Sequence, residues 1–358
     1  MGAWLHFEGA RVDRLAHPSG AVTLAAVTPP PVFLVNPRAG GGRTGARWAR
    51  AEARVLQRFP GAEVRFTDGP WHAVELARAA AAAGARRIVA VGGDGTVHEV
   101  ANGLLGAVPV GDAGGDGSPG PSDGPSDPAM VRAGPGAVLG FLPMGTGSDF
   151  ARGLGVPDDL EGQLDLLATA TPRRVDVGRV EYADDHGRRG ARWFVNEADF
   201  GLGASVAARV ARRRRPPGRG TYRRAALAAL LTWRDPEVVL RVDDAPPERH
   251  AVKSVFVCNG PLAGAGMWIA PDADPADARL DLVVFGPLGR FEAMRRLHET
   301  YGGRPIRHRH VHYRRCARLH AEVADPGRTV LVEADGEPLG RLPATFAVAP
   351  ARLAVLAP

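Results

Sequence analysis

Residues 88–100 read Ile-Val-Ala-Val-Gly-Gly-Asp-Gly-Thr-Val-His-Glu-Val, and this stretch decides the fold class of the chain. An apolar run typical of a strand is followed by three glycines, an aspartate and a threonine, and then by a helical pattern. This order predicts a strand, a tight turn and the start of a helix, which is where α/β proteins bind phosphate. Glycines at 92, 93 and 95 let the backbone approach a ligand closely.

The aspartate inside this turn is unusual for an anion site, because its charge repels phosphate. The first N–H groups of a helix are unpaired donors at the positive end of its dipole, so the turn can bind phosphate without a charged side chain. Asp94 therefore indicates a cation between its carboxylate and the phosphates.

The overall composition is that of a globular protein long enough for two domains. The chain has 358 residues, of which 45% are hydrophobic and 23% are charged. Its formal net charge of +6 comes almost entirely from arginine, and a basic surface favours anionic partners such as nucleotides or acidic lipid headgroups. We attribute the arginine bias to a GC-rich genome and expect no nucleic-acid partner.

The sequence carries no sign of secretion or of membrane insertion. Residues 1–31 lack a basic-then-apolar signal pattern, and no apolar run approaches the ~20 residues that span a bilayer. Cys258 and Cys316 each lie in an apolar or strand-like run, which indicates core positions in a reducing compartment. We expect a cytoplasmic protein that contacts a membrane only at its surface.

The first half of the chain alternates strands and helices, which predicts a parallel sheet built from βαβ units. We expect an α/β domain over residues 31–156, preceded by an N-terminal extension at 1–30 and interrupted by a disordered-type Gly/Pro/Ser/Asp insert at 111–136. The expected strands are Val32–Val35, Glu63–Thr67, Ile88–Val91 and Ala137–Leu142, and the expected helices are Ala46–Arg58 and Trp71–Ala83.

The texture changes after about residue 157, where short alternating runs predict an antiparallel β-sandwich over residues 157–340. The C-terminal segment, 341–358, can return to the first domain. The expected strands include Arg174–Val180, Arg192–Glu197, Val238–Val242, Val252–Cys258, Leu280–Phe285, Arg318–Val323 and Thr329–Ala334. Helical patterns interrupt them at Ala204–Arg213, Tyr222–Thr232 and Arg290–Tyr301.

Three glycine-containing turns follow expected strands of the first half, at residues 36–42, 92–98 and 143–149. The carboxyl ends of parallel strands lie at one edge of a sheet, so all three turns are expected at one ligand site. None of them has the Gly-Lys-Ser/Thr ending of a Walker A loop or the Gly-x-Gly-x-x-Gly dinucleotide pattern.

These residues resemble the motifs of the diacylglycerol kinase catalytic-domain family, whose superfamily includes bacterial lipid kinases, sphingosine kinases and ceramide kinases. The first-half motifs are Asn36-Pro37 with its glycines, Gly92–Thr96 and Leu142–Arg152. The second half continues in family order with Phe194–Asn196, Gly201–Gly203, Asn259-Gly260, Gly264–Met267, Ile269–Pro271, Leu280-Asp281 and Asp335–Glu337. The resemblance covers nearly the whole chain from residue 35 to about 340.

The resemblance implies an NAD-kinase-like α/β nucleotide domain, a β-sandwich domain and an active site between them. ATP contacts are implied at Asn36, Pro37, Arg38, Ala39, Gly40, Thr67, Gly92, Gly93, Asp94, Gly95, Thr96, Val97, His98, Glu99 and Thr146. Asp335 and Glu337 are implied as catalytic, one of them as the base, together with Asp94. Asp94, Asp149 and Asp176 are implied to support magnesium near the phosphates, and Asp274, Asp277 and Arg279 a second, structural metal.

Simpler interpretations remain for several of these residues. Position alone makes Asp335-Gly336-Glu337 a hairpin turn, and only the resemblance assigns it to catalysis. Asp176 is equally typical of a surface position in a strand, and the loop around Asp277 of a solvated turn. Ala278 stands where the family has glycine, which places the second metal in doubt.

The leading hypothesis is an ATP- and Mg²⁺-dependent kinase that phosphorylates a hydroxyl of diacylglycerol or a related lipid alcohol at the membrane surface. The rival enzyme is an NAD kinase, whose family shares the Gly-Gly-Asp-Gly-Thr turn. A non-catalytic nucleotide- or lipid-binding regulator also stays open, because Ser148 replaces the family's asparagine and Ala265 a glycine. Whether the chain forms a homodimer is left open.

Overall fold

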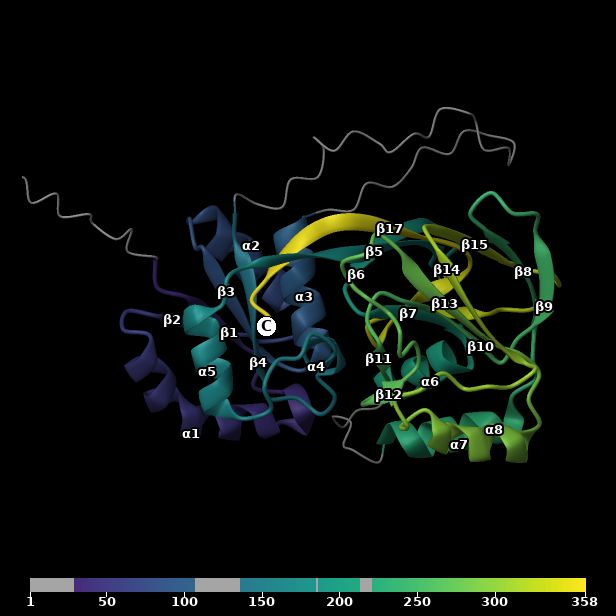
Figure 1. Ribbon diagram of the computed structural model, residues 1–358, viewed down its shortest axis with the longest axis horizontal. Helices are drawn as coiled ribbons and strands as arrows, with labels where there is room; N and C mark the ends of the chain where they lie inside the picture. The colour runs from purple at the N-terminus through teal and green to yellow at the C-terminus, as the bar shows by residue number, and fades with distance from the viewer. Residues whose placement is uncertain (1–28, 107–135, 185, 213–220) are drawn as a thin grey trace, which may run out of the picture.

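The computed structural model describes residues 29–106, 136–184, 186–212 and 221–358 (Figure 1). The expected N-terminal extension and the expected insert at 111–136 therefore lie almost wholly outside the described residues. In the part of the chain that the structure describes, no helix is long and apolar enough to cross a membrane.

The first domain is built on a parallel sheet in the order β2-β1-β3-β4. Its strands are β1 (Val32–Val35), β2 (Glu63–Phe66), β3 (Arg87–Gly92) and β4 (Val138–Pro143). Helices α2 (His72–Ala82) and α3 (Asp94–Leu105) cover one face, while α1 (Arg43–Arg58) and α5 (Leu160–Thr169) cover the other. Two short helices, η1 (Ala39–Gly41) and α4 (Asp149–Gly153), follow β1 and β4 at the carboxyl edge.

Helix α5 belongs to this first domain, although the sequence-based boundary at residue 157 precedes it. Leu164 and Leu167 are fully buried in the cluster that also holds Phe33, Trp48 and Leu142. An apolar helix face must be covered by a neighbouring layer, and the sheet of the first domain provides that layer. The first domain of the structure therefore continues to about residue 170.

The second domain is an antiparallel β-sandwich that also contains helices. Its strands are β5 (Arg173–Ala183), β6 (Arg189–Phe194), β7 (Glu197–Gly201), β8 (Glu237–Val242), β9 (Glu248–Ala251), β10 (Ser254–Cys258), β11 (Leu262–Ala263), β12 (Met267–Trp268), β13 (Leu280–Phe285), β14 (Val311–Cys316), β15 (Arg318–Val323) and β16 (Leu331–Ala334). Its helices are α6 (Leu202–Ala211), α7 (Thr221–Thr232) and α8 (Arg290–Glu299). Side chains of β7, β10, β13, β15 and β16 meet in one buried apolar cluster.

The last strand, β17 (Glu337–Val355), runs through both domains and ends in the first (Figure 1). It pairs antiparallel with β16, β15 and β5, and then parallel with β4, where Val355 lies opposite Leu139. The Leu356 N–H donates to the Leu139 carbonyl over 2.8 Å. This strand fixes the residues at its start, beginning with Glu337, relative to the sheet of the first domain.

The sequence predicts one strand over Arg192–Glu197, whereas the structure ends β6 at Phe194 and starts β7 at Glu197. The reason is a competing acceptor: the N–H groups of Val195, Asn196 and Glu197 all donate to the Asp335 carboxylate. Three consecutive N–H groups that turn to one side chain cannot continue a ladder of alternating bonds.

Candidate active site

The glycines of the β3–α3 turn make room for protein atoms. A Cβ on Gly92 would lie 2.3 Å from Thr96 Oγ1, and one on Gly145 would lie 2.3 Å from the Gly93 Cα. The N–H groups of Met144 and Gly145 both donate to the Gly92 carbonyl over 2.8 Å. The turn after β3 and the turn after β4 therefore pack backbone against backbone, which only glycine permits.

The turn after β1 joins the same assembly through Asn36. Its amide donates to Thr96 Oγ1 over 3.1 Å, and its side-chain oxygen accepts from the Arg38 N–H. Gly40, with a φ of 61°, approaches the Met144 carbonyl. The structure thus brings together all three turns that the sequence places at one edge of the sheet.

Helix α3 presents its N-terminus in the middle of this assembly. The N–H groups of Thr96 and Val97 already donate to the Gly93 carbonyl, which leaves those of Asp94 and Gly95 without an intrahelical acceptor. Such donors at the positive end of a helix favour a phosphate.

Asp94 and Asp149 form a carboxylate pair beside this helix end. Asp94 Oδ1 accepts from the Phe150 N–H over 3.2 Å, and Asp149 Oδ2 accepts from the Ala265 N–H over 2.7 Å. Both side chains also approach Gly147, where an added Cβ would lie 2.8 Å from Asp94 Oδ2 and 3.7 Å from Asp149 Oδ1. Asp149 Oδ1 is buried without a hydrogen-bond partner in the described structure.

Burial and mutual repulsion disfavour two charges in this pair. Burial raises the pKa of Asp94, although N–H groups of residues 148–150 oppose the rise. Burial, followed by the charge of Asp94, raises the pKa of Asp149 to about 7, and Arg152 Nη1, 3.8 Å from Asp149 Oδ1, offsets this rise only in part. A bound cation would remove the repulsion and give Asp149 Oδ1 a partner, so these two residues fit a magnesium ion.

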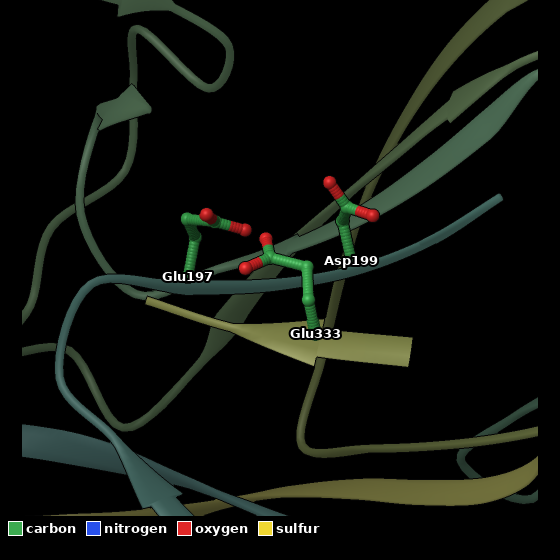
Figure 2. A group of neighbouring side chains, drawn as sticks. All are labelled: Glu197, Asp199 and Glu333. Carbon is green, nitrogen blue, oxygen red and sulfur yellow. The ribbon is translucent and has the colours of Figure 1, made fainter. Parts of the chain in front are cut away.

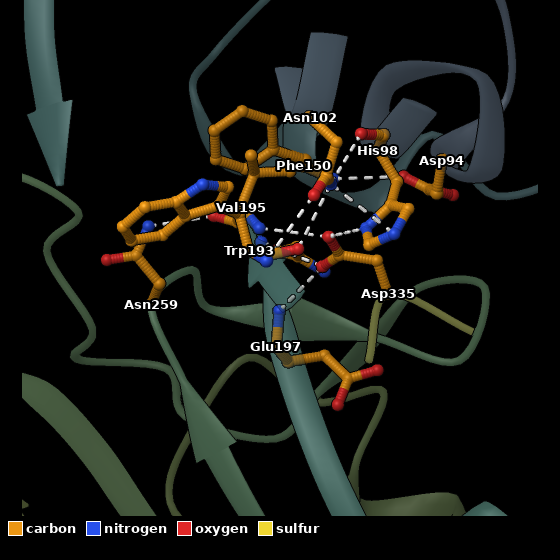
Figure 3. A network of polar contacts seen from close by, with 10 residues as sticks. Asp94, His98, Asn102, Phe150, Trp193, Val195, Glu197, Asn259 and Asp335 are labelled. Carbon is orange, nitrogen blue, oxygen red and sulfur yellow. Dashed lines mark hydrogen bonds and ion pairs between the residues drawn. The ribbon is translucent and has the colours of Figure 1, made fainter. Parts of the chain in front are cut away.

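Asp335 is saturated with hydrogen bonds, as Figure 3 shows. Its Oδ1 accepts from the N–H groups of Asn196 and Glu197, and its Oδ2 from that of Val195, over 2.9 to 3.1 Å. His98 Nδ1 of α3 lies 2.7 Å from Oδ2. Asp335 is buried, and its φ of 49° turns the chain out of β16. This carboxylate joins the domains and has no free position for substrate.

Glu337, the next carboxylate along the chain, lies differently. It is half-buried, and Glu337 Oε1 would lie 3.4 Å from a Cβ on Gly95, so its carboxylate stands over the open end of α3. Burial raises the pKa of Glu337, against a lowering influence of His98. In the described residues, the Glu337 carboxylate has no hydrogen-bond partner and remains free to take up a proton.

The other implied nucleotide contacts have mixed surroundings. The side chains of Thr67, Thr96, Val97 and His98 are buried. Glu99 accepts from the Ala73 N–H over 3.1 Å and thereby caps α2. Pro37, Arg38, Ala39, Gly40 and Thr146 are partly or fully accessible along the edge formed by the three turns.

Asp176 and the residues implied as a second metal site lie together in the second domain. Asp176 Oδ2 accepts from the Ala278 N–H over 2.7 Å, so it holds the 274–279 loop. Asp274 accepts from the Ala276 N–H, and Asp277 accepts from the Arg279 N–H while pairing with Arg315. These contacts tie up the loop's carboxylates within the protein, and the second metal site stays a prediction.

Sequence reasoning did not single out two further groups of side chains. Arg192 of β6 stacks on the Trp71 ring, with Cζ 4.2 Å from the ring centroid, and its charge lowers the pKa of Glu337. Glu197, Asp199 and Glu333 form a buried carboxylate cluster in the second domain. Glu197 and Asp199, which alternate with the apolar residues Ala198 and Phe200, are the signal that could have revealed this cluster.

The fold and the site define a two-domain protein of the NAD-kinase-like type. Residues 30–180 match the model of the diacylglycerol kinase catalytic domain, and residues 196–357 match that of the YegS C-terminal NAD kinase β-sandwich-like domain. The chain is 30% identical over 328 residues to a diacylglycerol kinase of Mycobacterium tuberculosis, which covers 91% of this chain and 94% of the relative. The chain belongs to the diacylglycerol kinase catalytic-domain family.

A second curated relative agrees with this assignment, and a solved structure shares the fold. A protein of Chromohalobacter salexigens named "Probable lipid kinase YegS-like" is 29% identical over 312 residues, covering 86% of this chain and 88% of the relative. The crystal structure of a diacylglycerol kinase from Bacillus anthracis str. Sterne superposes with a TM-score of 0.63 at 19% identity, covering 92% and 97% of the two chains. The fold class predicted from the sequence is confirmed.

Proposed function

We propose that this protein is an ATP- and Mg²⁺-dependent kinase that transfers a phosphoryl group to a hydroxyl of diacylglycerol or a related lipid alcohol. The observation that carries the proposal is the free carboxylate of Glu337 over the open N-terminus of α3. Family membership supports a kinase, and the assembly of three turns supports a nucleoside triphosphate as the phosphoryl donor.

The chemistry asks the protein to position two substrates and to neutralise charge. The N–H groups of Asp94 and Gly95 would bind phosphate oxygens, and Asp94 and Asp149 would hold Mg²⁺, which offsets phosphate charge when bound. Glu337 would accept the proton of the lipid hydroxyl while the hydroxyl oxygen bonds to the γ-phosphorus and the bond between this phosphorus and the leaving ADP oxygen breaks. Asp335 acts as a positioning residue that ties α3 to β16.

A substrate panel tests this proposal against the rival NAD kinase. Wild-type protein is incubated with Mg-ATP and either extracted lipids or NAD, and products are identified by mass spectrometry. We expect a phosphorylated lipid, no NADP, and a loss of at least ~100-fold in the Asp94→Asn variant. Formation of NADP would mean that the acceptor is NAD and not a lipid. A fully active Asp94→Asn variant would contradict the proposed role of Asp94.

A lipid acceptor requires access to a membrane, and we propose that α7 and α8 provide it. They lie side by side along one edge of the second domain (Figure 1). Helix α8 exposes apolar side chains and covers a charged one. Phe291 is 85% exposed, whereas the Arg296 side chain is largely covered and pairs with Glu299. The exposed apolar side chains of the two helices and the segment after α8 are Leu227, Leu231, Phe291, Met294, Leu297 and Tyr301.

The charge around this face suits an anionic lipid surface. Arg224, Arg290, Arg295 and Arg304 are exposed on or near the two helices. An apolar stripe flanked by arginine is typical of interfacial helices, because acyl chains take the apolar groups and anionic headgroups the guanidinium groups.

Vesicle sedimentation tests the membrane contact separately from catalysis. We expect binding to vesicles containing phosphatidylglycerol, weaker binding in high salt, and a loss of ~10-fold or more for Phe291→Asp. Phe66→Asp is the matched control, because Phe66 is also exposed but lies on β2 of the first domain. Equal losses in both variants would remove the α7–α8 face from the proposal and leave the kinase assignment standing.

A further inference from the structure

The carboxylate cluster of Glu197, Asp199 and Glu333 lies in the interior of the second domain, next to the Asp335 network, to which Glu197 contributes only its backbone N–H. Glu197 and Asp199 alternate on β7, and Glu333 lies opposite Asp199 on β16. One carboxylate oxygen of each residue lies within 4.8 Å of the other two. Figure 2 shows the three side chains projecting from the same face of the two strands.

The hydrogen bonding of this cluster is incomplete. Asp199 Oδ1 accepts from the Ala204 N–H at the start of α6, over 2.6 Å, and a protonated Glu333 carboxyl can bond to the side chains of Glu197 and Asp199. Glu197 Oε2 and Glu333 Oε2 are buried, since the two residues are 6% and 3% exposed, and apart from protons shared among the carboxyl groups they have no donor among the described residues. A buried carboxylate oxygen without a donor costs ~1–3 kcal/mol or more, so these atoms point to a missing partner.

The charge of the cluster is also uncompensated. Within the described residues, no arginine, lysine or histidine forms an ion pair with any of the three carboxylates. Burial, reinforced by neighbouring acids, raises the pKa of Glu197 and of Glu333 well above the usual range. Burial raises the pKa of Asp199 to about 7. Buried carboxylates of this kind are held either by shared protons or by a cation.

We propose that Glu197, Asp199 and Glu333 bind a divalent metal ion. Carboxylate oxygens are ligands of hard cations such as Ca²⁺, Mn²⁺ and Mg²⁺. Two oxygens on opposite sides of one such ion are ~4–5 Å apart, so a single ion can contact all three carboxylates. The ion gives Glu197 Oε2 and Glu333 Oε2 the partner that the protein does not supply.

The location gives the ion a structural role. It would tie β7 to β16, and these strands lead directly to the Asp335 network and to Glu337. The site shares no residue with the Asp94–Asp149 pair or with the 274–279 loop. It does not depend on which acceptor the kinase uses.

Metal analysis and anomalous diffraction test the inference. Wild-type protein is stripped with chelator, re-equilibrated with Mn²⁺ or Ca²⁺, and assayed for bound metal, and Mn²⁺-soaked crystals are measured at the manganese edge. We expect an anomalous peak among the three carboxylates. Glu333→Gln should lose about one equivalent of metal that the control Glu322→Gln, an exposed acid on β15, retains.

Two results would overturn the inference. One is a map of wild-type crystals without a peak at the cluster, which needs no variant to fold. The other is a free energy of unfolding of Asp94→Asn that Mn²⁺ and Ca²⁺ leave unchanged, because an ion bound to the folded state must stabilise it. If Glu333→Gln does not fold, Asp199→Asn takes its place in the metal assay.

Discussion

Asp335→Asn and Glu337→Gln should separate stability from catalysis at two carboxylates only two positions apart. The asparagine side chain in Asp335→Asn would keep one oxygen for the N–H groups of Asn196 and Glu197, but its NH₂ group would face the Val195 N–H in place of Oδ2. A donor would then meet a donor in a buried site. Glu337→Gln removes no hydrogen bond of the described structure and changes only proton affinity.

The magnitudes follow from these contacts. Leaving one buried N–H unsatisfied costs ~1–3 kcal/mol, and losing the charge that strengthens the remaining bonds adds ~1 kcal/mol, so Asp335→Asn should lower the free energy of unfolding by ~2–4 kcal/mol. Glu337→Gln should change it by less than ~0.5 kcal/mol. Loss of a general base typically lowers kcat by ~10²–10⁴-fold, and this loss belongs to Glu337→Gln.

Urea unfolding and phosphoryl transfer to lipid are measured on the same preparations of wild type and both variants. If Asp335 only positions its neighbours, Asp335→Asn should lose activity because less of the protein is folded and because KM rises. The kcat of the folded variant should change less. Unfolding of Asp335→Asn like wild type would contradict the positioning role of Asp335, and full kcat in Glu337→Gln would contradict the role of Glu337 as the base.

Three further predictions concern the site and its turns. Gly145→Ala should destabilise the protein by ~1–3 kcal/mol or more and weaken nucleotide binding, because its Cβ would overlap the Gly93 Cα, whereas Gly289→Ala, with open space around it, should unfold like wild type in the same urea titration. In the presence of chelator, the protonated Asp149 carboxyl, whose pKa is raised to about 7, stabilises the folded state fully below the pKa that Asp149 has in the unfolded chain, and this stabilisation is lost as pH rises through about 7. Asp149→Asn should therefore reduce the dependence of the free energy of unfolding on pH between pH 4 and 8. An unchanged pH dependence in the variant would contradict this prediction. Ala278 has a φ of 59°, so Ala278→Gly should raise the midpoint of urea unfolding slightly or leave it unchanged, and a clear drop would count against strain at this position.

The sequence was sufficient for the elements that depend on local pattern. The run from Ile88 to Val100 predicted a strand, a turn and a helix, and the structure has β3 and α3 there. Glycine spacing also predicted which three turns meet. These features depend on apolar periodicity and on positions with a positive φ or with no room for a Cβ, and residue types reveal both directly.

The remaining features depend on contacts between distant segments. Asp335 looks like a hairpin residue in sequence, and only the break between β6 and β7 shows that three N–H groups of residues 195–197 converge on it. The Glu197–Glu333 contact joins residues on neighbouring strands that the pairing of β7 with β16 brings together. The turn glycines were predicted to leave space for a ligand. In the structure, the space beside Gly92 is filled by the Thr96 side chain and the space beside Gly145 by the Gly93 backbone.

The most direct test of the account is the transfer of label from γ-labelled ATP to diacylglycerol in phosphatidylglycerol-containing vesicles, with and without Mg²⁺. We expect Mg²⁺-dependent labelled phospholipid from wild type and ~10²–10⁴-fold less from Glu337→Gln. Labelled lipid formed equally well by Glu337→Gln, or no labelled lipid from wild type across a panel of lipid alcohols, would contradict it.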